Sequence, residues 1–78
     1  MRPQYYRVKV READTPRQIE VECLDVIDAL NLGFNLGNVL KYLWRAGRKT
    51  PDALDDLKKA RTYIEREIAN RTFSLDDP

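Results

Sequence analysis

The chain has 78 residues, and its 14 lysines and arginines against 13 aspartates and glutamates leave a formal net charge of +1, so no overall field draws it onto nucleic acid or a membrane surface. It carries no histidine and a single cysteine, Cys23, which excludes a histidine-based nucleophile, an intramolecular disulfide and a cysteine-rich zinc site within one chain. A single domain over residues 1–78 lies near the lower size limit for one hydrophobic core, so we expect a homo-oligomer.

An extended N-terminal arm is predicted over residues 1–21. Within it, Tyr5 to Val10 alternates between two sets of side chains, which is the period of a half-buried β-strand. A strand needs a pairing partner, and Gln18 to Val21, beyond the polar turn Arg11 to Pro16, is the other segment of β-forming residues. We therefore expect either a hairpin or a strand that is donated to a second subunit.

Two helices are predicted to follow. From about Glu22 to Leu32 apolar residues recur at helical spacing, and Gly33 is placed to end this helix. A second helix is expected from about Leu36 to Ala46, with Gly47 closing it. Its apolar stripe should be buried, and it comprises Leu36, Val39, Leu40, Leu43 and Trp44.

A third helix should begin at Thr50-Pro51-Asp52, because threonine caps free amides, proline is tolerated at the first helical position, and aspartate complements the helix dipole. Its apolar residues continue to Ile68, and we expect it to end at about Arg71. The polar residues 72–78 are expected to form a flexible tail. The fold class that follows is mainly α: a small three-helix core over residues 22–71 with a short N-terminal strand or hairpin.

A face of the second helix carries a candidate ligand site. Helical spacing brings its members together, and they are Asn38, Lys41, Tyr42 and Arg45, followed past a glycine by Arg48 and Lys49. Lysine and arginine neutralise phosphates, arginine through paired hydrogen bonds. Asn38 could read a base edge or a sugar hydroxyl, and Tyr42 could stack on a base. This set predicts a binding site for a nucleotide or another phosphorylated small molecule.

The same stretch resembles a known family. The pattern Gly-Asn-x-x-Lys-Tyr-x-x-Arg-Ala-Gly-x-Lys is matched at Gly37, Asn38, Lys41, Tyr42, Arg45, Ala46, Gly47 and Lys49. Together with Asp56 to Arg61 and Tyr63 to Arg66, it resembles a small phage and prophage family of uncharacterised helical domains, described as nucleotide kinase-like by similarity to part of a T7-type phage nucleotide kinase. The resemblance spans roughly Ile19 to Ile68, and Tyr5-Tyr6-Arg7 stands where family members often carry a histidine-tyrosine pair.

The resemblance implies a phage-derived protein that acts on or binds nucleotides inside a bacterial host cell. The N-terminus has no apolar signal region, and no apolar run approaches the roughly 20 residues that span a bilayer, so a cytoplasmic protein is expected from the residues as well. No Gly-x-x-x-x-Gly-Lys-Ser/Thr loop is present, so side chains would have to hold the phosphates.

Two alternatives to simple nucleotide binding stay open. The first is a magnesium-dependent enzyme of nucleotide metabolism, kinase-like or hydrolytic, with Asp25, Asp28 and Asp56 on Mg²⁺, because i, i+3 spacing places Asp25 and Asp28 on one helical face. The second is a non-catalytic, oligomeric protein-interaction module. In that case the cations of the candidate site would be paired with neighbouring carboxylates. An open pocket in front of Lys41 and Arg45 would favour ligand binding.

Overall fold

A two-stranded hairpin and three helices form a flat, elongated molecule that measures 51 × 31 × 25 Å. This computed structural model describes residues 4–49 and 51–76, with the backbone alone described at residues 4 and 73–76. The elements of the described part are η1 (Gln4–Tyr6, a 3₁₀ turn), β1 (Arg7–Arg11), β2 (Gln18–Glu22), α1 (Cys23–Ala29), α2 (Phe34–Arg45) and α3 (Leu54–Asp76). The predicted fold class, mainly α with an N-terminal hairpin, is confirmed.

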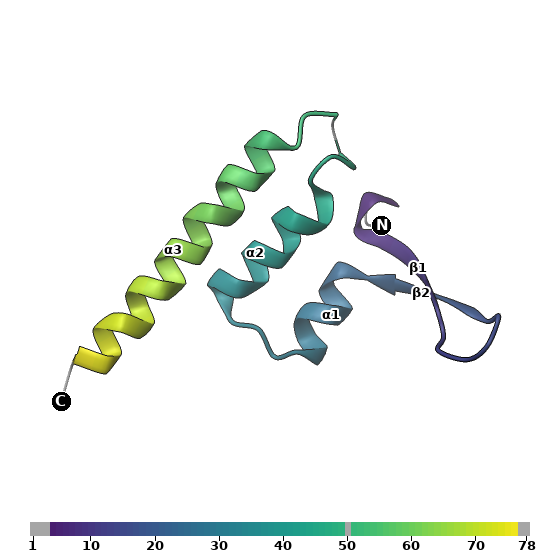
Figure 1. The fold of residues 1–78 in the computed structure, drawn as a ribbon, viewed down its shortest axis with the longest axis horizontal. Helices are drawn as coiled ribbons and strands as arrows, with labels where there is room; N and C mark the ends of the chain where they lie inside the picture. The colour runs from purple at the N-terminus through teal and green to yellow at the C-terminus, as the bar shows by residue number, and fades with distance from the viewer. Residues whose placement is uncertain (1–3, 50, 77–78) are drawn as a thin grey trace.

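The helices lie side by side, with α2 between α1 and α3, and the hairpin extends from the end of the molecule that carries α1 (Figure 1). Helix α1 approaches α2 closely at Gly37, where a Cβ atom would lie 3.4 Å from Ile27 Cγ2. A Cβ at this distance would be in ordinary van der Waals contact, so Gly37 packs directly against the Ile27 side chain.

The hairpin pairs within one chain. Strands β1 and β2 are antiparallel, in a register that runs from Arg7 opposite Glu22 to Arg11 opposite Gln18. The amide of Glu12 donates to the carbonyl of Arg17 over 2.8 Å and closes the turn. The expected hairpin is confirmed, although its first strand begins two residues later than Tyr5, because Tyr5 belongs to the preceding 3₁₀ turn.

Helix α1 ends earlier than predicted, at Ala29 instead of Leu32. Asn31 adopts a left-handed backbone with φ of 53°, so it breaks the helix two residues before Gly33. Asparagine tolerates this conformation better than other residues with a side chain. Gly33 has extended backbone and stands at the N-cap of α2, and α2 ends before Gly47, whose φ of 76° fits its predicted role.

Helix α3 starts later and ends later than predicted. The Asp52 side chain accepts a hydrogen bond from the amide of Leu54 over 2.9 Å, and this aspartate contact starts the helix. The expected threonine cap at residue 50 lies outside the described residues. The helix continues to Asp76, five residues beyond Arg71, so most of the expected flexible tail, residues 72–78, is helical backbone. Residues 77–78 lie outside the described part.

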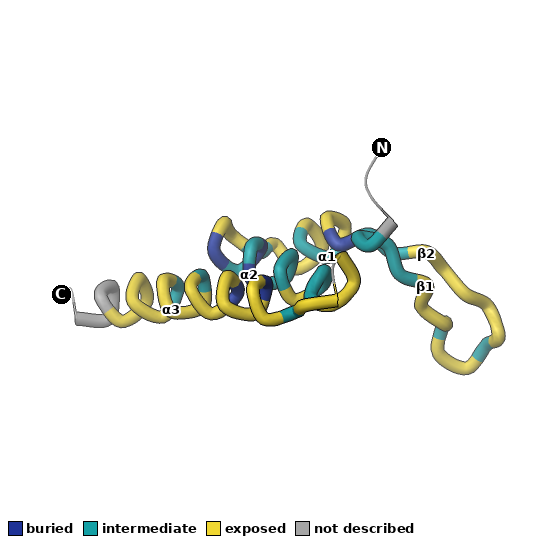
Figure 2. The backbone as a smooth tube through the Cα atoms, turned by 90° about the horizontal axis from the view of Figure 1, so that it is seen from above, coloured by how far each residue is buried: buried dark blue, intermediate teal, exposed yellow. Residues whose placement is uncertain are grey.

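The core of the described residues is small (Figure 2). Its buried apolar side chains are Cys23, Val39 and Ala60. The predicted stripe of α2 is only partly buried: Val39 is covered, but Leu43 is 49% exposed, so the prediction for Leu43 was wrong. The helices of the described part include no segment with the length and hydropathy that a bilayer-spanning helix needs.

Candidate functional site

Four of the six predicted ligand-binding residues, Asn38, Lys41, Tyr42 and Arg45, share one face of α2, but their side chains have different surroundings. The Asn38 amide nitrogen donates to the carbonyl of Phe34 over 2.9 Å, one turn earlier in the same helix. This side chain is therefore folded back onto its own backbone. The contact uses one of the two amide hydrogens, and the reading of a base edge or sugar hydroxyl by Asn38 stays a prediction.

Arg45 is held by the protein itself. Its Nε lies 3.2 Å from Asp56 Oδ1, in an ion pair whose side chains are 15% and 6% exposed, although the Nε–H group is not aligned for a hydrogen bond. Its Nη1 donates to the Tyr6 hydroxyl over 3.3 Å. Burial alone would lower the pKa of Arg45, but the hydrogen bond to Tyr6 and the charge of Asp56 raise it. Arg45 thus ties α2 to α3 and to η1, and is not a free phosphate-binding cation.

Tyr42 is half-buried and stacks on a ring of α3. Its ring lies nearly parallel to the ring of Tyr63, at 16° with centroids 5.9 Å apart, so a protein ring lies over one of its faces. Two ammonium groups lie near the same ring: Lys41 Nζ is 4.5 Å and Lys59 Nζ 5.6 Å from its centroid. Lys59 is also paired with Asp55 over 3.2 Å. Positively charged side chains therefore cluster around the Tyr42 ring, where α2 contacts α3.

Arg48 and Lys49 lie beyond α2, in the turn that follows Gly47, and both are exposed. Arg48 Nη2 donates to the carbonyl of Arg7 over 2.7 Å and so holds the hairpin against this turn. Neither residue lines the pocket that Lys41 borders. Arg48 and Lys49 therefore lie outside the pocket, although their backbone amides both donate to the carbonyl of Arg45.

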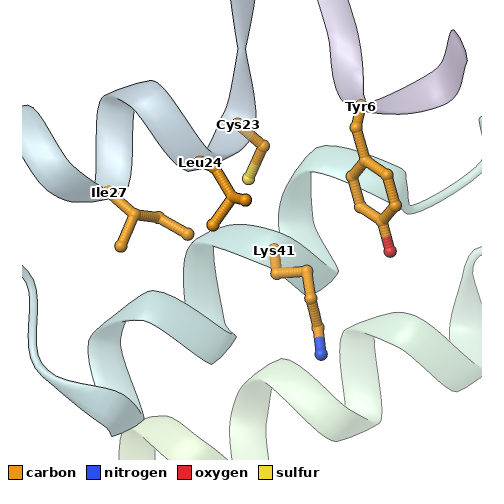
Figure 3. Close-up of a pocket in the computed structure, with 5 residues that line it drawn as sticks. All are labelled: Tyr6, Cys23, Leu24, Ile27 and Lys41. Carbon is orange, nitrogen blue, oxygen red and sulfur yellow. The ribbon is translucent and has the colours of Figure 1, made fainter. Parts of the chain in front are cut away.

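Lys41 differs from its neighbours because it borders a pocket. The cavity has a volume of about 220 Å³ and is lined by Tyr6 from η1, by Cys23, Leu24 and Ile27 from α1, and by Lys41 (Figure 3). Figure 3 shows the ammonium of Lys41 pointing away from Ile27, in the same general direction as the Tyr6 hydroxyl. Among the described residues, no carboxylate forms an ion pair with Lys41. The pocket is thus an apolar hollow edged by one cation, whose ammonium lies over the Tyr42 ring and pairs with no carboxylate of the described chain.

Cys23 is the buried polarisable group of this pocket. Burial raises the pKa of its thiol, and the charge of Lys41 acts against that shift. The thiol is therefore protonated at neutral pH and contributes as a small apolar wall.

Sequence analysis did not predict that residues of η1 and α1 would line a common pocket. The pattern of apolar residues places Leu24 and Ile27 on the apolar side of a helix and Tyr6 on one side of a strand, but it does not bring the two segments together. The contact of Tyr6 with α2 depends on how the 3₁₀ turn folds back, and local periodicity carries no signal for it.

The predicted metal site does not form. Asp25 and Asp28 are exposed on α1, whereas Asp56 is buried on α3 against Arg45. No group of three metal-binding side chains gathers anywhere among the described residues. The spacing of Asp25 and Asp28 put them on one helix, but the fold places α2 between that helix and Asp56.

Of the ion pairs expected in place of a ligand site, one is found among the described residues. Arg45 is paired with Asp56, as that alternative required. Within the described chain, neither Lys41 nor Lys49 forms such a pair, and Arg48 is held by a backbone carbonyl. The predicted cationic face is therefore divided between a structural cation, Arg45, and an open one, Lys41.

Comparison with known families matches residues 17–65 to the family described as "Protein of unknown function (DUF3310)". The expected nucleotide kinase-like phage family was wrong, because the description of the matching family includes neither a kinase activity nor a phage origin. No curated protein and no solved structure matches the chain. The family match covers more than half of the sequence, so the chain belongs to the DUF3310 family.

Proposed function

We propose that this DUF3310 protein binds a small molecule that joins a phosphate to a compact apolar or planar group, as a nucleoside monophosphate does. The observation that supports this most strongly is Lys41: its stem lines an apolar pocket, and its ammonium has no carboxylate partner in the described chain. A phosphate would supply the missing counter-charge through a charge-assisted hydrogen bond.

The size of the pocket limits what it can hold. Pockets for drug-sized ligands occupy roughly 300–1,000 Å³. The cavity beside Lys41 is smaller, at about 220 Å³, so it suits one planar or apolar group and leaves a phosphate at the rim. The walls contributed by Leu24 and Ile27 favour a ligand group with an apolar surface over a charged group. A ligand with both parts would therefore bind better than either part alone.

Tyr6 adds a hydrogen-bond donor to this rim. Its hydroxyl oxygen accepts from Arg45 Nη1 over 3.3 Å, which leaves the hydroxyl hydrogen available for another acceptor. The hydroxyl points in the same general direction as the ammonium of Lys41 (Figure 3). We assign Arg45 the role of a positioning residue, which orients the Tyr6 hydroxyl, while Lys41 and Tyr6 contact the phosphate.

Calorimetric titration with three kinds of probe tests the proposal. The probes are the nucleoside 5′-monophosphates, the matching free nucleosides and inorganic phosphate. At least one monophosphate should bind more tightly than both its nucleoside and phosphate, because it uses the pocket and Lys41 together. Lys41→Gln should lower the affinity for that monophosphate by about tenfold and leave the affinity for the nucleoside unchanged.

Lys58→Gln is the matched control, since Lys58 is an exposed lysine of α3 that does not line the pocket. It removes the same charge from the whole molecule and should leave every affinity unchanged. The proposal is contradicted if no monophosphate binds at millimolar concentration, or if both lysine variants lose affinity equally. Because these ligands are abundant inside cells, we also retain the proposal of a cytoplasmic location.

A further inference from the structure

Helix α3 carries an exposed apolar stripe away from the proposed ligand site. Leu57, Ile64 and Ile68 are 45%, 39% and 58% exposed, and their spacing of seven and four residues aligns them along one flank. Lys59 and Arg66, which approach the rings of Tyr42 and Phe34, lie about 160° around the helix from this stripe at 3.6 residues per turn. The stripe therefore faces away from the cations gathered at Tyr42.

Leu43 extends the same surface onto α2. It is 49% exposed and follows Lys41 by two residues, which turns it about 200° around the helix axis from the pocket cation. We call Leu43, Leu57, Ile64 and Ile68 the apolar flank. Large exposed apolar patches on a folded protein mark interaction surfaces.

The rest of the fold leaves this flank without a cover. Helix α3 has 23 residues and α2 has 12, and the C-terminal part of α3 runs past the end of α2 (Figure 1). Most of the stabilisation of a helix in a protein comes from packing of its apolar side. The three buried apolar side chains of the described part, Cys23, Val39 and Ala60, form a small core for a chain of this length. A partner on the apolar flank would add the packing that the single chain lacks.

We infer that the partner is a second copy of this chain, with the two α3 helices antiparallel about a two-fold axis near Tyr63. Arg61 and Glu65 border the stripe, are exposed, and form no ion pair within the described chain. An antiparallel arrangement brings Arg61 opposite Glu65 of the partner subunit, and two-fold symmetry repeats that pair. In the same register Leu57 of one copy lies opposite residue 69 of the other, one residue from Ile68. Charge and apolar positions therefore match to within one residue in one register.

Sedimentation analysis across a range of micromolar concentrations tests the dimer. The wild-type chain should be dimeric, and Ile64→Glu with Ile68→Glu should make it monomeric while the helical circular dichroism signal is retained. Val10→Glu with Ile19→Glu is the matched control, because these hairpin residues are 43% and 38% exposed and lie outside the apolar flank. This control should remain dimeric. A monomeric wild-type chain, or a dimer that survives the α3 substitutions, would overturn the inference.

Charge reversal tests the antiparallel register. Arg61→Glu should weaken the dimer several-fold, since it places like charges opposite each other twice. Adding Glu65→Arg to the same chain restores opposite charges at both positions and should restore dimerisation. A double variant that stays as weak as the single variant contradicts the register. The nucleotide titration is independent of both results, because the pocket and the apolar flank share no residue.

Discussion

The pair between Arg45 and Asp56 shows how one buried contact can connect three elements. It joins α2 to α3, and the hydrogen bond from Arg45 to Tyr6 extends the connection to η1. Removing one partner from a buried ion pair leaves the other charge uncompensated, which costs more than the loss of an exposed pair. The contact is therefore a stability determinant as well as a support for the Tyr6 hydroxyl.

Two neighbouring aspartates allow this to be measured. Asp56→Asn should lower the free energy of unfolding by about 3 kcal/mol in urea titrations, because it leaves the Arg45 side chain, which is 15% exposed, without its carboxylate partner. Asp55→Asn is the matched control: its side chain is 75% exposed and its pair with Lys59 lies on the surface, so its effect should stay below about 0.5 kcal/mol. Equal losses in the two variants would show that the burial of the Arg45 pair does not matter.

The sequence predicted the presence of each strand and helix more accurately than the residues at which each element begins and ends. Alternation indicated the hairpin, and helical spacing indicated three helices, because both patterns depend on burial of one side. The early end of α1 at Asn31 and the long α3 depend on single backbone conformations and on helical continuation through polar residues. Neither produces an apolar pattern that could be recognised beforehand.

The sequence predicted which candidate site residues share a face of α2, but it did not predict their contacts with other elements. The spacing correctly placed Asn38, Lys41, Tyr42 and Arg45 on one face of α2. Whether each side chain was free depended on residues distant in sequence: Asp56 and Tyr6 hold Arg45, and Tyr63 stacks on Tyr42. Those partners are set by packing of α3 and η1 on α2, for which a single sequence gives no direct signal.

Substitution of the glycines that flank α2 tests what determines the two ends of this helix. Gly47 has a φ of 76°, a conformation that costs a side chain roughly 1–2 kcal/mol, so Gly47→Ala should lower the free energy of unfolding by about 1 kcal/mol. Gly33→Ser is the contrasting change, because Gly33 has φ of −77°, open space around its Cα, and an N-cap position that favours serine. It should leave stability unchanged or raise it. Thermal and urea unfolding of both variants would show whether the left-handed residue ends α2 as described.

The side-by-side arrangement of the helices gives the protein two distinct sides. The seam between α2 and α3 gathers Lys41, Arg45 and Lys59 around Tyr42 on one side, whereas Leu43 and the α3 stripe lie on the other. A dimer formed through the apolar flank would leave the pocket beside Lys41 open in each copy. Ligand binding and self-association are therefore compatible in one assembly.

The pocket beside Lys41 is the centre of the functional account, and NMR titration locates a ligand on it most directly. As the best-binding nucleoside monophosphate from calorimetry is added, the signals of Lys41, Leu24 and Ile27 should shift and saturate together. The exposed Arg48 and Lys49, which lie outside the pocket, should change little. Saturable shifts confined to the pocket residues would support the account. Shifts confined to Arg48 and Lys49, or no saturable shift for any monophosphate, would contradict it.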